Sequence, residues 1–382
     1  MRKFQIFIFC ILCSAAGCLE DETGDFTSGS YYPTFPEDTT EEEVDPDPVD
    51  TIPPPPCWDE VIIATRSDEF NERFTRYGDG WTGGDATYSV YLPDGRTVWI
   101  FGDTFLGTVN EDRSRPGTGL INNSFVVQDG DQMTTLYTGT PSNAKALIIP
   151  PEPGWWYWPT DGTVYMDTLQ IMLSAFRSTG GGIFGFAYAA IDIARFSLPD
   201  LQLIDINRKI LDPTIAFGAA VMEGNDGYTY VYGVEKEGIN KYLHIARAAN
   251  GDISDDWEYF NGTDWVSDIS QSQRLMNDVS EQFGIFNYEG HNYMITHNHI
   301  FGKQIYLWES PTPEGPWTFK NTVYCTPETG GDIWTYNSFV HPQFMENEEL
   351  LVSYNNNSFN FGDLFRNADN YRPHFVRIAN WK

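Results

Sequence analysis

The chain has 382 residues, of which 54 are acidic and 23 are basic, and its formal net charge at pH 7 is −31. This charge excludes nucleic acid as a partner, because phosphates need a basic surface, and it excludes electrostatic docking on anionic lipid. A neutral or cationic partner is compatible with it. The five cysteines have no metal-type spacing, and we expect no metal or other cofactor.

Residues 1–18 read as a targeting segment. Arg2 and Lys3 precede an apolar run that is too short to span a membrane. The run ends in small residues before Cys18, which resembles a bacterial lipoprotein signal with Cys18 as the lipidated residue. The acidic stretch LEDE that follows resembles the export signal of Bacteroidetes-type surface lipoproteins. The resemblance implies an outer-membrane lipoprotein exposed at the cell surface, and an ordinary secretory signal is the alternative.

Residues 19–56 are expected to be a disordered tether. They hold 12 acidic residues, several prolines and no Lys or Arg, so they cannot bury enough apolar surface to fold. Residues 57–382 keep 42 acidic and 21 basic residues, a formal charge of about −21. We expect contact with a membrane only through the lipid anchor.

A hairpin pattern recurs five times in residues 57–382. Each copy has an apolar run, a turn rich in Asp, Asn, Gly or Glu, and a second apolar run. A third run follows most copies, and a fourth follows two of them. The copies begin at Asp85, Pro159, Ala216, Glu281 and Ser338.

These units predict an all-β fold, a five-bladed β-propeller with four-stranded blades over residues 57–382. A six-bladed propeller is the nearest alternative, but we find only five hairpins. The last unit ends at its third strand, so we expect residues 59–67 to supply its outer strand and to leave no open edge. Such a ring needs no partner subunit, and we expect a monomer. Cys57 begins this strand and Cys325 ends the fourth unit, so we predict a disulfide between them.

In a propeller, the first strand of each blade starts, and the second strand ends, at one central pocket. Asp85 and Asp103 hold these places in the first hairpin, so we expect adjacent carboxyl groups. Equivalent places in the other blades hold acids, amides, His and Trp, which bind sugar hydroxyls or stack on sugar rings. The expected substrate-binding residues are Trp158, Asp161, Glu235, Asn298 and His341.

Glycoside hydrolysis needs an acid to protonate the leaving oxygen and a carboxylate to activate water or attack the sugar. We assign Asp85, which two glycines precede, as base or nucleophile. Asp103 tunes its neighbour, positions substrate or acts as a catalyst itself. Glu281 precedes an apolar run that would keep it protonated, so we assign it as general acid, with Glu235 as a weaker substitute. The alternatives are aspartates that brace turns and a solvated loop glutamate.

Two other clusters invite a functional interpretation. Residues 153–162 hold three tryptophans, and we expect at least one to line the pocket. His297 and His299 share one face of a strand, but a metal would need a third ligand, so we favour a hydrogen-bonding histidine at the pocket rim.

The stretch YSVYLPDGRTVWIFGDTF, residues 88–105, resembles the signature of surface-lipoprotein propellers grouped as domains of unknown function 4185 and 5005. SPTPEGPW, residues 310–317, is similar to a blade-end phrase of arabinan- and xylan-cleaving five-bladed propellers. Of these two domain groups, the first, domain of unknown function 4185, includes endo-D-arabinanases. The resemblance implies a glycoside hydrolase acting on an extracellular polysaccharide, arabinan-like or otherwise rich in pentose or furanose. At the level of residues it extends only to Asp85 and to Gly102-Asp103-Thr104.

Two other functions stay open. One is a surface propeller that binds glycans without cleaving them. The other is a protein-interaction propeller, which would not need acids and tryptophans around its pore.

Overall fold

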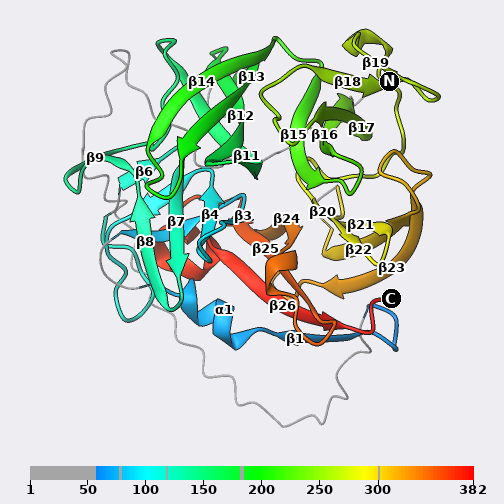
Figure 1. The fold of residues 1–382 in the computed structure, drawn as a ribbon. Helices are drawn as coiled ribbons and strands as arrows, with labels where there is room; N and C mark the ends of the chain where they lie inside the picture. The colour runs from blue at the N-terminus through cyan, green and yellow to red at the C-terminus, as the bar shows by residue number, and fades with distance from the viewer. Residues whose placement is uncertain (1–56, 77–79, 118, 181–184, 300–301) are drawn as a thin grey trace, which may run out of the picture.

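The computed structural model describes residues 57–76, 80–117, 119–180, 185–299 and 302–382. The fold is all-β, as predicted, with five antiparallel sheets of four or five strands and two smaller sheets (Figure 1). The predicted signal segment, with Cys18, and the predicted tether lie outside the described residues. No helix in the described part of the chain is long and apolar enough to cross a membrane.

Each predicted hairpin is present as the first two strands of one sheet. Turn glycines with positive φ, such as Gly95 and Gly227, allow these tight reversals. The first strands are β3 (Tyr88–Tyr91), β11 (Trp155–Tyr165), β15 (Ile215–Glu223), β20 (Gly284–Tyr288) and β24 (Ile333–Val340). The second strands are β4 (Thr97–Phe101), β12 (Thr168–Ser178), β16 (Tyr228–Glu237), β21 (His291–His297) and β25 (Leu350–Ser358).

Third and fourth strands complete the sheets. The sequence pattern misses the third strand of the first sheet, because an insertion separates that strand from its hairpin, and it misses the fourth strands of the first two sheets. The third strands are β7 (Ser124–Asp129), β13 (Phe186–Ser197), β17 (Asn240–Ala249), β22 (Gln304–Ser310) and β26 (Pro373–Ala379). The fourth strands are β8 (Gln132–Leu136), β14 (Leu203–Leu211), β18 (Trp257–Phe260), β23 (Thr318–Cys325) and β1 (Ile63–Arg66).

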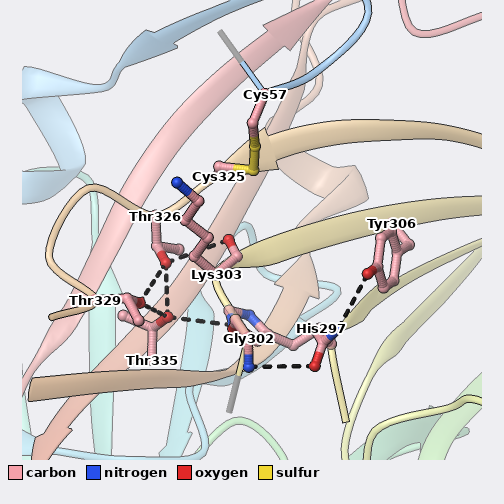
Figure 2. Close-up of a disulfide and its surroundings, with 10 residues drawn as sticks. Cys57, His297, Gly302, Lys303, Tyr306, Cys325, Thr326, Thr329 and Thr335 are labelled. Carbon is pink, nitrogen blue, oxygen red and sulfur yellow. Dashed lines mark hydrogen bonds between the residues drawn. A yellow bond between two sulfur atoms is a disulfide. The ribbon is translucent and has the colours of Figure 1, made fainter. Parts of the chain in front are cut away.

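The N-terminal strand β1 completes the last sheet, which confirms its predicted place. It pairs antiparallel with β26, and the order of the sheet is β1-β26-β25-β24. Cys57, just before β1, forms a disulfide with Cys325, the last residue of β23, and the two Cα atoms are 6.2 Å apart (Figure 2). The N-terminal end of the described chain is therefore tied to both the fourth and the fifth sheet.

The third sheet departs from four strands. A fifth strand, β19 (Trp265–Val266), pairs with β18 after a turn at Gly262, whose φ is +100°. The ring of Trp265 lies 5.3 Å from that of Phe260 and 5.9 Å from that of Tyr230, so aromatic packing stabilises this extra strand.

The remaining elements are short. One small sheet flanks the open end of the first hairpin, because β2 ends just before Asp85 and β5 begins just after Asp103. Its strands are β2 (Trp81–Gly84), β5 (Thr104–Leu106) and β6 (Gly119–Ile121); β9 (Thr138–Thr140) pairs with β10 (Asn143–Lys145). The α-helices are α1 (Asp68–Arg73) and α2 (Asp363–Arg366), and the 3₁₀ turns are η1 (Ile269–Gln271), η2 (Pro342–Phe344) and η3 (Ala368–Asn370).

The hydrophobic core is divided among the gaps between neighbouring sheets. Tyr88 of the first sheet packs in one cluster with Ile171 of the second. Further clusters join the second sheet to the third, the third to the fourth, the fourth to the fifth, and the fifth back to the first. The sheets therefore follow one another around a common centre in chain order, as Figure 1 shows.

Candidate active site

The open end of the first hairpin places two aspartates side by side. Asp85 lies between β2 and β3, and Asp103 lies between β4 and β5. The Asp85 N–H donates to the Asp103 carbonyl at 3.3 Å, and the Gly102 N–H donates to the Asp85 carbonyl at 3.0 Å. The register of the hairpin thus brings the two side chains together, as its sequence predicts.

The Asp85 carboxyl is buried beside two tyrosines. The residue is 5% exposed, and the Tyr336 hydroxyl donates to its Oδ2 at 3.0 Å. Burial raises the pKa of Asp85 to about 6, and hydrogen bonds from the hydroxyls of Tyr336 and Tyr371 oppose that rise. Asp85 therefore has the donors that an ionised carboxylate needs.

The two carboxyl oxygens of Asp103 differ in their hydrogen bonding. It is 1% exposed, and its Oδ1 accepts the Trp158 indole N–H at 2.9 Å and the Asn122 amide at 3.2 Å. Its Oδ2 is buried and has no hydrogen-bond partner among the described residues. Burial, and next the charge of Asp85, hold the pKa of Asp103 well above its usual range. The two carboxyls therefore titrate as a coupled pair, in which burial and the neighbouring charge favour a form that keeps a proton.

The buried pair should make stability depend on pH. Because the pKa of Asp85 is higher in the folded chain, its contribution to the free energy of unfolding is full below about pH 4 and is lost as pH rises through about 6. The melting temperature of Asp85→Asn, measured relative to the parent, should therefore rise between pH 4 and pH 7.

Asp94 in the turn of the same hairpin is the matched control. Its ion pair with Arg96 lowers its pKa, so the relative stability of Asp94→Asn should instead fall, or stay constant, over that range. Melting curves for both variants that run parallel to the parent at every pH would contradict the coupled titration of the buried pair.

Trp158 belongs to an aromatic cluster at the same end of the second sheet. Its ring lies 4.4 Å from Phe176, and Phe176 lies 4.3 Å from Tyr188. Trp156 and Phe186 complete the cluster, at 5.9 Å and 5.4 Å from Trp158. Phe176 is buried, and the other four side chains are partly exposed. The predicted role of Trp158 in binding stays a prediction, but its indole N–H also orients Asp103.

Asp161 braces two sheets. It lies in the β-bulge of β11, and its carboxyl oxygens accept the N–H groups of Gly162 at 2.8 Å and Val221 at 2.7 Å. Burial raises its pKa to about 7. Because both oxygens already accept backbone N–H groups, the predicted contact with substrate is not established.

The premise for Glu281 as general acid is wrong. Its carboxyl faces the ammonium groups of Lys236 at 2.8 Å and Lys241 at 3.7 Å, rather than apolar surroundings. These lysines come from the third sheet, so the sequence around Glu281 does not reveal them.

Glu235 also forms an ion pair within the protein. Its two oxygens accept the Arg274 guanidinium at 2.7 Å each, and one also faces His244 at 3.1 Å. The hydrogen bond from Arg274 lowers the pKa of Glu235 to about 2. It is therefore neither a substitute acid nor a carboxylate left available for substrate.

Asn298 and His341 are structural. The Asn298 side chain donates to the Tyr306 hydroxyl at 3.0 Å and accepts the Gly302 N–H at 3.2 Å. His341 is completely buried, and its ring nitrogens contact the hydroxyls of Ser89 and Ser353 at 2.6 and 2.8 Å. The predicted contact of His341 with substrate is thus wrong, because this part of the fifth sheet packs against the first.

His297 belongs to a buried polar network rather than a metal site. Its ring contacts the Ser338 hydroxyl and the Gly302 carbonyl at 2.8 Å each, and burial lowers its pKa to about 4. Thr335 links it to the hydroxyl of Thr326, which follows the disulfide (Figure 2). The described residues contain no cluster of three potential metal ligands.

Sequence reasoning missed three groups that contact the aspartates. Tyr336 lies two residues before Ser338, where the fifth copy of the hairpin pattern begins, so the pattern points to its neighbourhood. Tyr371 lies in the insertion between η3 and β26, and Asn122 lies between β6 and β7; neither belongs to a hairpin. No periodic signal could have found these two.

A family model described as "Domain of unknown function (DUF5005)" matches residues 67–381. No curated protein matches the chain. Among solved structures, a Bacteroides ovatus protein named as a candidate hydrolase is similar, with a TM-score of 0.74 and 26% identity over 84% of this chain and 91% of the other.

Two more distant structures are enzymes by name. A GH43_1 enzyme from Xanthomonas citri in complex with xylose has a TM-score of 0.47 and 12% identity over 84% of this chain and 90% of that one. A xylan β-1,4-xylosidase from Bacillus halodurans has a TM-score of 0.45 and 10% identity over 80% of this chain and 54% of that one. Structural similarity this weak does not indicate what activity the chain has.

Proposed function

We propose that this chain, which belongs to the DUF5005 family, is a glycoside hydrolase whose catalytic groups are Asp85 and Asp103. The observation that carries the proposal is the buried pair of adjacent carboxyls, in which Asp85 accepts a hydroxyl donor from Tyr336 and Asp103 keeps an oxygen with no partner among the described residues. The naming of the Bacteroides ovatus relative as a candidate hydrolase agrees with it.

The five sheets are, in this proposal, the blades of a five-bladed propeller. Their core clusters join neighbours in chain order, and the fifth is joined to the first. Tyr336 of the fifth sheet reaches Asp85 beside the first, and Trp158 of the second reaches Asp103. The carboxyl pair thus receives contacts from the sheets on both sides of its own.

The chemistry follows from the difference between the two acids. Asp103, with the higher pKa, donates its proton to the glycosidic oxygen, and the bond from that oxygen to the anomeric carbon breaks. Asp85, as carboxylate, either accepts a proton from the attacking water or attacks the anomeric carbon itself. The first route inverts the configuration of the sugar and the second retains it, so the product anomer distinguishes them.

The substrate in this proposal is an extracellular polysaccharide, with arabinan and other pentose-containing glycans as the first to test. The purified protein should release new reducing ends from at least one neutral polysaccharide in a panel. Failure to release ends from any of them, by protein that is folded, would contradict hydrolysis.

One observation favours the alternative, a propeller that binds glycans without cleaving them. Asp85 and Asp103 are almost completely covered, while the aromatic side chains beside them are partly exposed. If binding to a glycan is found and no reducing ends appear, this alternative holds.

We also propose that the protein is a lipoprotein of the outer membrane, anchored through Cys18 and displayed at the cell surface. The support is the sequence of residues 1–56. Protease treatment of intact cells should release the β-sheet part of the chain. Release only after the outer membrane is opened would contradict surface display, and a soluble secreted form would contradict the anchor.

A further inference from the structure

We propose that Trp156, Trp158, Phe186 and Tyr188 form a platform that stacks on sugar rings of a neutral glycan, and that the glycan extends along it from the carboxyl pair toward Lys236. These four residues are called the platform below. The inference rests on the proposed function insofar as the carboxyl pair marks where cleavage occurs. It adds the binding surface and the charge class of the ligand.

The platform is continuous with the carboxyl pair. Trp158 donates to Asp103 at 2.9 Å, and Phe176 lies beneath the cluster in contact with both Trp158 and Tyr188. The Lys236 ammonium lies 5.5 Å from the centre of the Tyr188 ring and 2.8 Å from Glu281. A path of contacts therefore runs from Asp103 beside the first sheet, across the second and third sheets, to Glu281, which lies shortly before the first strand of the fourth sheet.

The strand register explains why these residues meet. Trp156 near the start of β11 is paired with Phe176 near the end of β12, and Phe176 is paired with Tyr188 near the start of β13. In the first sheet, Asp85 and Asp103 lie at the corresponding end, before the first strand and after the second. The platform and the carboxyl pair thus lie at equivalent ends of neighbouring sheets.

The chemistry of the platform suits a sugar. Aromatic rings that stay partly in water offer flat apolar surface to the C–H face of a sugar. The hydrogen bond from Trp158 to Asp103 places these rings beside the carboxyl pair, so a glycan stacked on them would reach the same site.

The charges indicate that this ligand is neutral. The basic groups near the platform already face acids: Lys236 and Lys241 face Glu281, and Arg274 faces Glu235 and Glu237. Arg177 at the end of β12 pairs with Asp212. A uronate or sulfate group would meet no unopposed cation among these residues.

The test is binding by the Asp85→Asn variant, which keeps the platform and removes the carboxylate. Titration calorimetry with soluble neutral polysaccharides (arabinan, arabinoxylan, galactomannan, mixed-linkage glucan) and acidic ones (polygalacturonate, alginate) should show binding only to neutral members. Adding Phe186→Ala or Tyr188→Ala should weaken that binding by about tenfold each. Phe319→Ala is the matched control, because Phe319 is an exposed aromatic residue on β23 of the fourth sheet, and it should change nothing.

The outcomes separate this inference from the proposed function. Neutral binding that is lost in the platform variants, with no reducing ends released by the parent, would uphold the platform and refute hydrolysis. Hydrolysis by the parent with unchanged binding in both platform variants would uphold the proposed hydrolysis and refute the platform. Preference for an acidic glycan, or no binding to any neutral one, would overturn the platform inference. If Tyr188→Ala does not fold, Phe186→Ala alone decides, because Phe186 lies at the first position of β13 and is partly exposed.

Discussion

Replacing Asp85 with asparagine should lower hydrolysis by at least about a thousandfold while the protein still folds and binds glycan. The amide keeps the size of the carboxyl and can still meet the Tyr336 hydroxyl, but it can neither accept a proton from water nor attack a sugar. Initial rates on the best substrate, measured beside melting temperature and glycan affinity, separate lost chemistry from lost structure.

Asp94→Asn provides the control within the same hairpin. Asp94 lies in the turn at the far end of the hairpin, where it pairs with Arg96, so its loss should leave the rate within about twofold. An Asp85→Asn enzyme with the parent rate would refute the assigned role. The carboxyl pair would then be a brace between sheets.

The second large effect is expected from adding a single methyl group next to the pair. A Cβ atom at Gly102 would lie 2.6 Å from Oδ1 of Asp85 and 3.6 Å from Trp158, so Gly102→Ala must displace the carboxyl or its strand. A displacement of about 1 Å costs on the order of a hundredfold in rate when geometry controls the reaction. We therefore expect turnover to fall by about two orders of magnitude, with a smaller change in glycan affinity.

Gly119→Ala is the matched substitution, because a Cβ atom at Gly119 meets nothing within 4 Å. It should leave the rate unchanged. If Gly102→Ala and Gly119→Ala have equal activity, the position of the Asp85 carboxyl does not control the reaction, and its assignment as catalyst loses its geometric support.

The adjacency of Asp85 and Asp103 could be predicted because both belong to one hairpin, whose register is set by its own turn and apolar pattern. The place of β1 could be predicted because the last unit lacks a fourth strand. The disulfide could be predicted because Cys57 and Cys325 then lie at the ends of neighbouring outer strands. Local periodicity is sufficient for features of this kind.

Features that depend on contacts between sheets could not be predicted in this way. The surroundings of Glu281 depend on Lys236 and Lys241, which reach it from another sheet, and those of His341 depend on the first sheet, which covers it. Tyr371, whose hydroxyl opposes the rise in the pKa of Asp85, comes from an insertion without strand periodicity. The electrostatic environment of a carboxyl is set by whatever packs against it, and one sequence without its fold does not contain that information.

The covalent link between Cys57 and Cys325 has a mechanical consequence for a chain held by its N-terminus. A pull on residue 57 would otherwise act directly on β1, which is four residues long and could be peeled from β26 one hydrogen bond at a time. The bridge diverts part of that force into β23, an eight-residue strand of the fourth sheet with six residues paired to β22. Tension transmitted along the N-terminal segment is thus borne by two sheets at once, and the edge strand that completes the last sheet is spared.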